Sequence, residues 1–310
     1  MPLPDDFLEL AREVNNWGRW GPGDEIGTLN LITDVVVRRA VACVKTGKRF
    51  SLALPLSEDG PMLGNIPGRP GNPERSMLSL HLAMTKNPDA ILFSDDAVTM
   101  PLQCATHWDG LAHVCYSGRM YNGFPMDSVD ERGASRLGIA NVRTLVTRGV
   151  MLDVARAKSV DRLEGGYPIT PEDLDAAESF AGVHVEPGDA ILVRTGHMRW
   201  LKEGNKKAYS AGDSPGPGMA ATRWLRARDI AAVATDSVTF EVWPCEQKGL
   251  LFPVHLLDLV EMGLTQGQNF DLESLAADCA ADGVYEFLLS ASPEPFERGL
   301  GSPVNPVAIK

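Results

Sequence analysis

The sequence lacks any long run of apolar residues. A membrane-spanning helix needs about 20 predominantly apolar residues in succession, and no stretch of the 310 residues approaches that length. The first residues, MPLPDDFLELAREVNNW, carry acids where a secretory signal would carry positive charge, and no long apolar region follows them. We therefore expect a cytoplasmic protein with no membrane partner.

Cysteine is also scarce. The five cysteines are odd in number and far apart, and none is paired at the Cys-x-x-Cys spacing of a structural zinc site: Cys43, Cys104, Cys115, Cys245 and Cys279. This pattern is typical of reduced intracellular thiols. For Cys104, no neighbouring base that would lower its pKa can be identified. A small buried residue is therefore the favoured interpretation, and a nucleophile is the alternative.

Positive charge is outnumbered by negative charge. Lys and Arg total 29 against 41 Asp and Glu, which gives a formal net charge of −12. Binding to nucleic acid requires clustered Lys and Arg, and the nearest cluster, Lys202, Lys206 and Lys207, is typical of a solvated helix end or loop. No GxGxxG segment leads from a strand into a helix, and no GxxxxGK[ST] loop occurs. We expect neither a nucleic-acid partner nor a cofactor held by such a loop.

The apolar residues that are present predict alternating strands and helices. Strands are expected at 49–56, 78–84, 90–100, 149–155, 189–196 and 230–237. Helices are expected at 4–16, from the Thr33 cap, from Thr170-Pro171, at 219–229 and at 274–283. Residues 57–77, rich in Pro and Gly, predict a long lid or binding loop rather than a linker. The alternation indicates an α/β or mixed α+β fold in one domain, 1–310.

One short stretch holds an unusual number of side chains that can bind a metal ion or move a proton. Residues 103–113, QCATHWDGLAH, hold two of the chain's six histidines and an aspartate. If 103–109 is extended, Gln103, His107 and Asp109 point to one face, and such nitrogen and oxygen ligands suit a divalent metal. Gly110 allows a turn that returns His113 to the same pocket, as a ligand to a second metal or as a nearby base. The alternative is two unrelated histidines, one in the core and one at the surface.

This stretch resembles the metal-binding motif of the cyclase-like metal-dependent hydrolases, which include bacterial kynurenine formamidase and isatin hydrolase. Their motif, His-x-Gly-Thr-His-x-Asp-x3-His, matches at four of six positions, with Gln103 and Ala105 replacing the first histidine and the glycine. The family's late glutamate corresponds to Gln268. Further similar segments extend the resemblance over most of the chain: GVMLDVA, DAILVRTGH, ATDSV, PVHLL with His255, and GQNFDLESL.

The resemblance implies a fold, an assembly and a ligand set. The fold is the swivelling β/β/α fold, and the assembly is a homodimer or homotetramer in which an N-terminal arm, about 1–48, reaches a neighbouring subunit. The metal ligands are His107, Asp109 and His255, with the amides of Gln103 and Gln268 as weaker ligands. Because two strong ligands are replaced, we expect one divalent ion, manganese or zinc, rather than two. A metal-free protein is the alternative.

The expected function is hydrolysis of an amide, a cyclic amide or imide, or a lactone or other ester of a small-molecule substrate. A metal ion would activate water, and His113 would move the proton. Trp108 and Tyr116 are candidates for substrate binding, and Asp236 is a candidate for orienting a histidine by a hydrogen bond. Two alternatives are a metal-dependent lyase or cyclase and a catalytically weakened small-molecule-binding protein.

Overall fold

A single mixed sheet organises the chain. The computed structural model describes residues 3–65, 68–87 and 89–310, and within them nine strands pair in the order β1–β15–β13–β7–β9–β11–β12–β4–β14. The four central strands β7, β9, β11 and β12 are parallel, and the outer strands pair antiparallel. Their bounds are β1 Arg49–Ser51, β4 His107–Asp109, β7 Val146–Asp153, β9 Ala190–Arg194, β11 Ala232–Thr235, β12 Thr265–Gln268, β13 Glu286–Ser290, β14 Gly301–Pro303 and β15 Val307–Ile309.

The central strands are buried on both faces. Along β7 and β9 the side chains alternate between two apolar clusters, with Leu152 and Val193 in one cluster and Met151 and Leu192 in the other. Continuous apolar runs of this kind are typical of parallel strands covered by helices on both sides. The strands expected at 149–155, 189–196 and 230–237 are therefore present in the sheet. The strand expected at 49–56 is shorter, because only Arg49–Ser51 pairs with β15.

The predicted helices are present, and their caps explain where they begin. The Thr33 side chain accepts a hydrogen bond from the backbone of Val36, and Thr170 and Asp173 form a reciprocal capping box. The main helices are α1 Asp5–Val14, α2 Asp34–Ala42, α4 Pro171–Ala181, α7 Ala221–Ala227 and α9 Glu273–Asp282. Shorter helices are α3 Val154–Ala157, α5 Met198–Lys202, α6 Lys206–Ala211, α8 Pro253–His255, the π-helix η5 Leu256–Met262, and the 3₁₀ turns η1 Gly27–Leu31, η2 Tyr121–Gly123, η3 Met126–Ser128 and η4 Ile139–Asn141.

The N-terminal segment packs on its own chain. The buried face of α1 includes Phe7 and Leu10 and lies against η5 and α7. The Trp17 indole N–H donates to the carbonyl of Val260 at 2.7 Å. The apolar face of α1 therefore packs into the core of its own chain. Residues 1–2 of the predicted N-terminal segment, about 1–48, lie outside the described residues. Contact of this segment with a neighbouring subunit stays a prediction.

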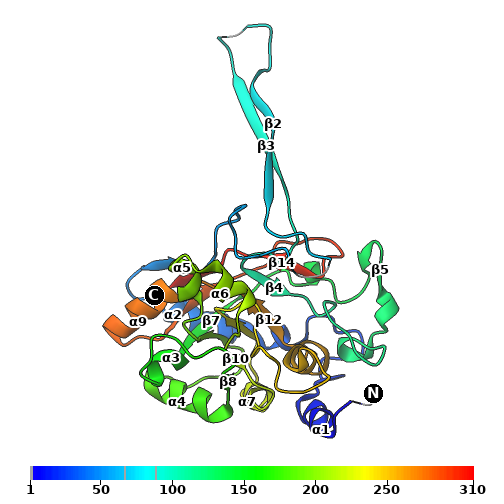
Figure 1. Cartoon of the computed structure of the whole chain (residues 1–310), viewed down its shortest axis with the longest axis vertical. Helices are drawn as coiled ribbons and strands as arrows, with labels where there is room; N and C mark the ends of the chain where they lie inside the picture. Colours follow the sequence, from blue (N-terminus) through cyan, green and yellow to red (C-terminus); the bar gives the residue numbers. More distant parts are fainter. Residues whose placement is uncertain (1–2, 66–67, 88) are drawn as a thin grey trace.

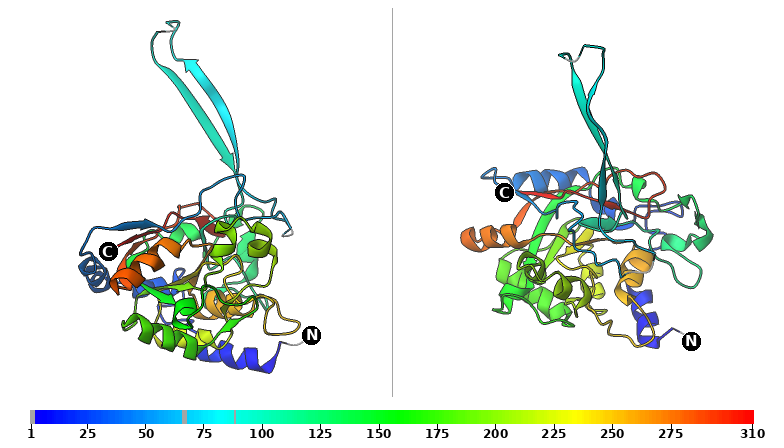
Figure 2. Two further views of the ribbon diagram at one scale, coloured as in Figure 1. Left: turned by 60° about the vertical axis from the view of Figure 1, so that its left-hand side comes forward. Right: turned by 45° about the horizontal axis from the view of Figure 1, so that its top comes forward.

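A long two-stranded hairpin projects from the body. Strands β2 (Glu74–Ala83) and β3 (Leu92–Thr99) pair antiparallel with each other and stand clear of the body in three views (Figures 1 and 2). We call residues 74–87 and 89–99 the arm. The strands expected at 78–84 and 90–100 exist, but they do not join the nine-stranded sheet. The predicted loop is also shorter, 57–73, and its residues 66–67 lie outside the described residues.

Two small pairings of two-residue strands complete the strands of the described residues: β5 Val129–Asp130 with β6 Gly133–Ala134, and β8 Pro168–Ile169 with β10 Gly216–Pro217. None of the helices in the described part of the chain has the length and apolar character that a bilayer-spanning segment needs.

Candidate functional site

Strand β4 places His107 and Asp109 on one face of the sheet. The strand lies between β12 and β14, with His107 opposite Gln268. Alternation along the strand turns Trp108 to the opposite face, where its indole N–H donates to the Ala291 carbonyl and its ring packs edge-on against Phe270. Trp108 is fully buried. The prediction that it binds substrate was therefore wrong, because strand alternation makes it a core residue.

The absence of a side chain at position 267 makes room for that tryptophan. A Cβ atom built on Gly267 would lie 2.7 Å from the Trp108 ring and 2.7 Å from the Phe270 ring. Such an approach is shorter than side chains tolerate, so the segment Gln266-Gly267-Gln268 needs glycine at its centre. The tight packing fixes the position of β12 beside β4, and with it the position of the Gln268 amide beside Asp109.

The ring of His107 presents a lone pair to the site. Its Nδ1 lies 2.7 Å from the carbonyl oxygen of Ala105, and because a carbonyl can only accept, Nδ1 carries the proton. Nε2 is then an acceptor, 3.5 Å from Oδ1 of Asp109. Both atoms are buried, and neither has a hydrogen-bond partner among the described residues. In the neutral form of His107, two buried acceptors therefore face each other without a hydrogen bond between them.

His255 reaches the same carboxylate from the other side of the pocket. Glu241 accepts hydrogen bonds from the backbone N–H groups of Val254 and His255 and from Nδ1 of His255 at 2.5 Å. Nε2 of His255 is thereby left as an acceptor, 3.9 Å from Oδ2 of Asp109. Sequence reasoning missed Glu241, since an acid inside TFEVWP carries no recognisable spacing to His255.

Gln268 lies where the resemblance places it. Its amide nitrogen donates to Oδ2 of Asp109 at 2.7 Å and lies 3.3 Å from Nε2 of His255. The amide of Gln266 approaches the same oxygen at 3.4 Å. In this orientation Gln268 acts as a hydrogen-bond donor to the carboxylate, while its predicted role as a weak metal ligand stays a prediction.

Gln103 occupies a different position from the predicted one. Residues 102–106 form turns, and the extended strand begins only at His107, so Gln103 does not share the face of His107 and Asp109. Its amide nitrogen instead lies 3.0 Å from Nδ1 of His113. His113 does return to the site, as Gly110 was expected to allow, with its Nε2 3.8 Å from Oδ1 of Asp109.

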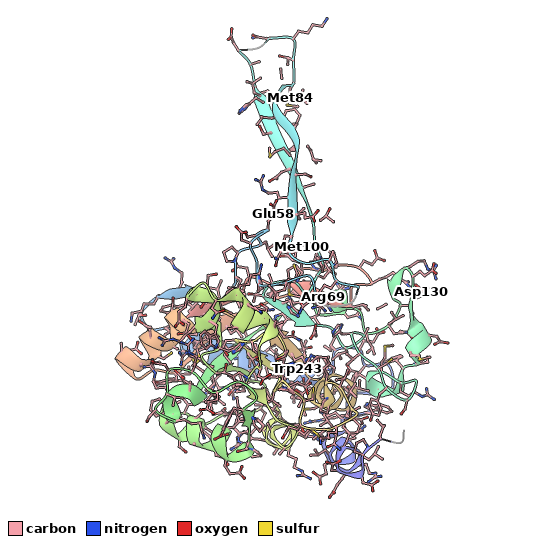
Figure 3. All side chains as sticks on the ribbon, viewed as in Figure 1. Glu58, Arg69, Met84, Met100, Asp130 and Trp243 are labelled. Atoms are coloured by element: carbon pink, nitrogen blue, oxygen red, sulfur yellow. The ribbon has the colours of Figure 1, made fainter. Side chains whose placement is uncertain are left out.

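A cavity of about 160 Å³ is lined by the five polar residues His107, Asp109, His113, His255 and Gln268, together with Arg69, Val114, Val238, Thr239 and Phe252. Arg69 comes from the loop 57–73, donates to the carbonyl of Gln103 and lies just below the foot of the arm (Figure 3). The predicted binding loop therefore contributes one residue to the cavity, although nothing in the sequence singled out Arg69.

Charge and burial together set the protonation of the site. Burial by itself would raise the pKa of Asp109, but His113, His107 and His255 outweigh it and hold that pKa well below its ordinary value. Burial lowers the pKa of His113, although the Asp109 carboxylate opposes the shift. The two shifts favour the ionised carboxylate of Asp109 and the neutral imidazole of His113.

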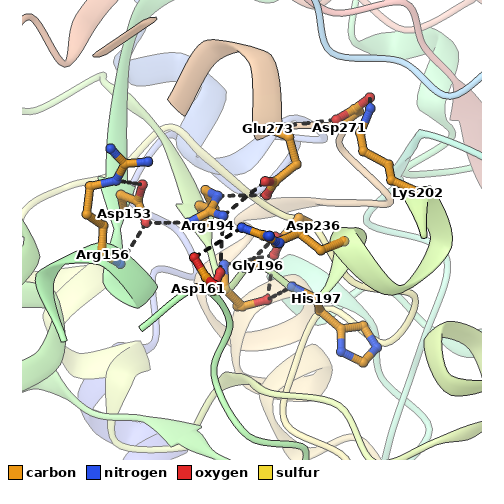
Figure 4. Close-up of polar contacts among 12 residues, drawn as sticks. Asp153, Arg156, Asp161, Arg194, Gly196, His197, Lys202, Asp236, Asp271 and Glu273 are labelled. Carbon is orange, nitrogen blue, oxygen red and sulfur yellow. Dashed lines mark hydrogen bonds and ion pairs between the residues drawn. The ribbon is translucent and has the colours of Figure 1, made fainter. Parts of the chain in front are cut away.

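Two further candidates lie away from the cavity. The Tyr116 hydroxyl donates to Glu261, and its ring packs against Phe7, so Tyr116 does not line the cavity. Asp236 accepts from the backbone and hydroxyl of Thr195 and from the backbone of Gly196 (Figure 4). It therefore fixes the turn after β9 and orients none of the cavity histidines. The orienting carboxylate is Glu241, five residues further along the chain.

The donor set fits a metal ion held by few protein ligands. Among the described residues, no three His, Cys, Asp or Glu side chains have the spacing of a complete three-ligand metal site. The facing lone pairs of His107 Nε2 and Asp109 Oδ1 are nevertheless costly when buried without a partner, and a cation is the group that satisfies two acceptors at once. A neutral Nε2 and a carboxylate are both common ligands of divalent metals.

Comparison with known proteins identifies the family. Residues 50–242 match the model of the Cyclase family, described as "Putative cyclase". A solved structure described as a novel cyclase is 36% identical, with a TM-score of 0.88 over 97% of this chain and 99% of that chain. No curated protein matches this chain.

More distant structures share the fold. Isatin hydrolase A from Labrenzia aggregata, bound to benzyl benzoate, is 21% identical over 88% of this chain and 96% of that chain, with a TM-score of 0.63. A predicted metal-dependent hydrolase from Bacillus stearothermophilus is 17% identical over 85% of this chain and 98% of that chain, with a TM-score of 0.51. The expected fold of the cyclase-like hydrolases is thus confirmed, and the chain belongs to the cyclase family.

Proposed function

We propose that the protein is a metal-dependent hydrolase that cleaves an amide, a cyclic amide or imide, or a lactone. The observation that carries this proposal is the pair of buried, unpartnered lone pairs on His107 and Asp109, which face each other across 3.5 Å beside a small cavity. Membership of the cyclase family and the fold shared with the isatin hydrolases support hydrolase or cyclase chemistry.

His107 and Asp109, whose lone pairs face each other, would hold the metal, and His255, with its Nε2 3.9 Å from Oδ2 of Asp109, is the proposed third ligand. A divalent ion bound there would lower the pKa of a water molecule toward neutrality and polarise the scissile carbonyl. Manganese and zinc both suit imidazole with carboxylate. One ion per chain is the expected content, because Asp109 is the one carboxylate lining the cavity among the described residues and the Gln268 amide already donates to it.

The role of His113 depends on the amide beside it. A base must present a free lone pair at Nε2, and the proton must then sit on Nδ1, where only an oxygen can accept it. The Gln103 amide meets this need when its oxygen faces Nδ1, and among the described residues it has no other hydrogen bond that opposes such a rotation. His113 would then take a proton from water and pass it to the leaving group, with Gln103 as its positioning residue.

Metal content together with a substrate panel tests the proposal. The purified protein is dialysed against manganese or zinc, analysed for bound metal, and assayed on isatin and other cyclic amides, imides, formamides and lactones. We expect one ion per chain and turnover that is lost on chelation and restored by metal. Absence of stoichiometric metal together with absence of any metal response would refute the proposal.

A substitution at His113 separates the base from the ligands. His113→Gln should retain the metal and lose about 10²–10⁴-fold in turnover. His184→Gln is the matched control, because that histidine is 85% exposed and far from the cavity, and it should change neither quantity. Full turnover in His113→Gln would show that the proton is moved by another group.

A metal-dependent lyase or cyclase is the second candidate, favoured by the 36% identity to a protein described as a novel cyclase. The two reactions differ in the fate of water. Hydrolysis in ¹⁸O-labelled water places the label in the product acid, whereas ring closure with loss of water or elimination of water does not.

A further inference from the structure

One positively charged side chain of the cavity has no negatively charged partner. Arg69 lines the cavity and is half-buried, and it forms no ion pair within the described part of the chain. Most arginines of the chain pair with an Asp or Glu side chain. The others that lack an acidic partner are all exposed: Arg12, Arg38, Arg49, Arg119 and Arg143. Because a charge taken out of water is costly without a partner, the unpaired guanidinium of Arg69 indicates a ligand.

The contacts of Arg69 leave one edge of its guanidinium free. Nη1 donates to the backbone carbonyl of Gln103 at 3.2 Å, which anchors the side chain beside the segment that carries His113. Burial lowers the pKa of His113, and the positive charge of Arg69 adds to the shift, so this charge lies close to the imidazole. Nε and Nη2 have no acceptor among the described residues. These two nitrogens form a planar fork that matches the two oxygens of a carboxylate.

The other charges around the cavity also favour an anion. Asp109 is the one carboxylate in the lining as far as the chain is described, and its Oδ2 already accepts from the Gln268 amide at 2.7 Å. The nearby Glu241 is occupied by the backbone N–H and the Nδ1 of His255. A divalent ion and Arg69 would together bring three positive charges against these two negative ones. A surplus of positive charge in a cleft attracts a negatively charged ligand.

The remaining lining describes the body of that ligand. Val114, Val238 and Phe252 supply apolar surface, and the Phe252 ring is held by stacking against Trp243, with 5.5 Å between the ring centroids. The cavity of about 160 Å³ is smaller than the roughly 300–1,000 Å³ that drug-sized ligands occupy. The lining therefore fits a small molecule with an apolar part and one carboxylate.

We propose that the substrate carries a carboxylate of its own, separate from the bond that is cleaved, and that Arg69 binds this carboxylate. The inference rests on the proposed function, to which it adds the substrate class: a small amide, imide or lactone that bears a carboxylate. Hydrolysis leaves this group unchanged, so Arg69 binds it equally in the substrate and in the transition state. Such binding determines KM and specificity rather than kcat.

Equilibrium binding tests the role of Arg69 without relying on turnover. The probes are benzoate and benzamide, which have nearly the same shape and differ in charge, and calorimetric titration of the full chain dialysed against manganese measures both. Wild type should prefer benzoate. Arg69→Gln should lose about 10–100-fold in affinity for benzoate and leave the affinity for benzamide unchanged. Arg69→Lys keeps the charge without the fork and should recover part of the loss.

The matched control is Arg119→Gln. Nη1 of Arg119 also donates to a backbone carbonyl, that of Gly123 at 2.9 Å, but Arg119 is exposed and does not line the cavity, so the change should alter neither affinity. The metal content of Arg69→Gln should equal that of wild type. A wild type with no preference for benzoate, or an Arg69→Gln variant with unchanged benzoate affinity, would overturn the inference. Loss of metal from Arg69→Gln would also overturn it, since Arg69 would then be a structural residue of the metal site.

Kinetics separates this inference from the proposed function. 2-Formamidobenzoate and 2-formamidobenzamide are a matched pair of formamides, of which only the first carries a carboxylate. Arg69→Gln should raise KM for the first about 10–100-fold, keep kcat within about threefold, and leave both constants for the second unchanged. A fall in kcat for both compounds would place Arg69 at the scissile carbonyl and overturn the inference. Absence of metal and turnover in wild type, with the preference for benzoate intact, would refute the proposed function alone.

Discussion

The cavity and the arm depart from ordinary burial in opposite directions. In the cavity, charged and polar groups lie inside: Asp109 has no exposed surface, and the His107 side chain is 1% exposed. On the arm, apolar groups lie outside: Leu78 and Leu80 are 69% and 67% exposed. The apolar core around the central strands follows the normal rule, with fully buried residues such as Leu152 and Leu192.

Both departures are informative because each is unfavourable for the isolated chain. A buried acceptor without a donor loses its hydration, and an exposed leucine retains its contact with water. A folded protein can retain such unfavourable groups when an ion or another molecule binds to them. A cation would satisfy the facing lone pairs of His107 and Asp109, and contact with another molecule would cover the exposed row on the arm.

Removing the charge of Asp109 should have the largest effect. Asp109→Asn keeps the size of the side chain but removes the ligand charge, so metal content should fall and kcat/KM should drop by more than about 10³-fold, equivalent to several kcal/mol of transition-state stabilisation. Metal analysis and steady-state kinetics measure both. Asp95→Asn, at an exposed acid of the arm, is the matched control. Retention of metal and activity in Asp109→Asn would place the chemistry elsewhere.

A pair of leucine substitutions compares the core with the arm directly. Leu192→Ala in β9 removes a fully buried side chain and should lower the free energy of unfolding by about 2–5 kcal/mol. Leu80→Ala in β2 should change it by no more than about 0.5 kcal/mol. Denaturant unfolding measures both. Equal losses would mean that the arm folds as part of the core.

The carboxylate that orients His255 should have an intermediate effect. Glu241→Gln replaces the acceptor of the His255 Nδ1 proton, and loss of a carboxylate that orients a metal-binding histidine reduces metal affinity by about 10–100-fold. Asp236→Asn is the control, because that buried carboxylate bonds Thr195 and Gly196 rather than a cavity histidine. It should lower stability by about 1–3 kcal/mol and leave metal affinity unchanged. Similar affinities for both variants and wild type would remove Glu241 from the site.

The charged foot of the arm should matter least. Arg75 and Asp96 form an ion pair at 3.3 Å between side chains that are 63% and 55% exposed. Arg75→Gln should therefore change the free energy of unfolding by less than about 1 kcal/mol. Denaturant unfolding measures the change, and a loss above about 2 kcal/mol would mean that this ion pair, rather than strand pairing, holds the foot of the arm together.

The sequence predicted the central strands and the capped helices because their signals are local. A continuous apolar run such as 149–155 indicates a buried strand wherever it lies, and Thr170-Pro171 begins a helix by satisfying its own first turn. The role of Trp108 was mispredicted although the strand alternation that buries it can be read locally. For Gln103 the assumption of an extended segment failed, since residues 102–106 form turns.

The sequence by itself determined the family, the strand and helix pattern, and the grouping of His107, Asp109 and His113 within one short segment. Tertiary structure alone decided that His255 and Gln268 reach Asp109, that Glu241 rather than Asp236 orients a histidine, and that the strands 74–83 and 92–99 leave the body. The physical reason is that alternation and capping act between near neighbours in the chain. Whether other elements cover a strand, and whether a carboxylate contacts a distant histidine, depends on contacts between residues far apart in the sequence.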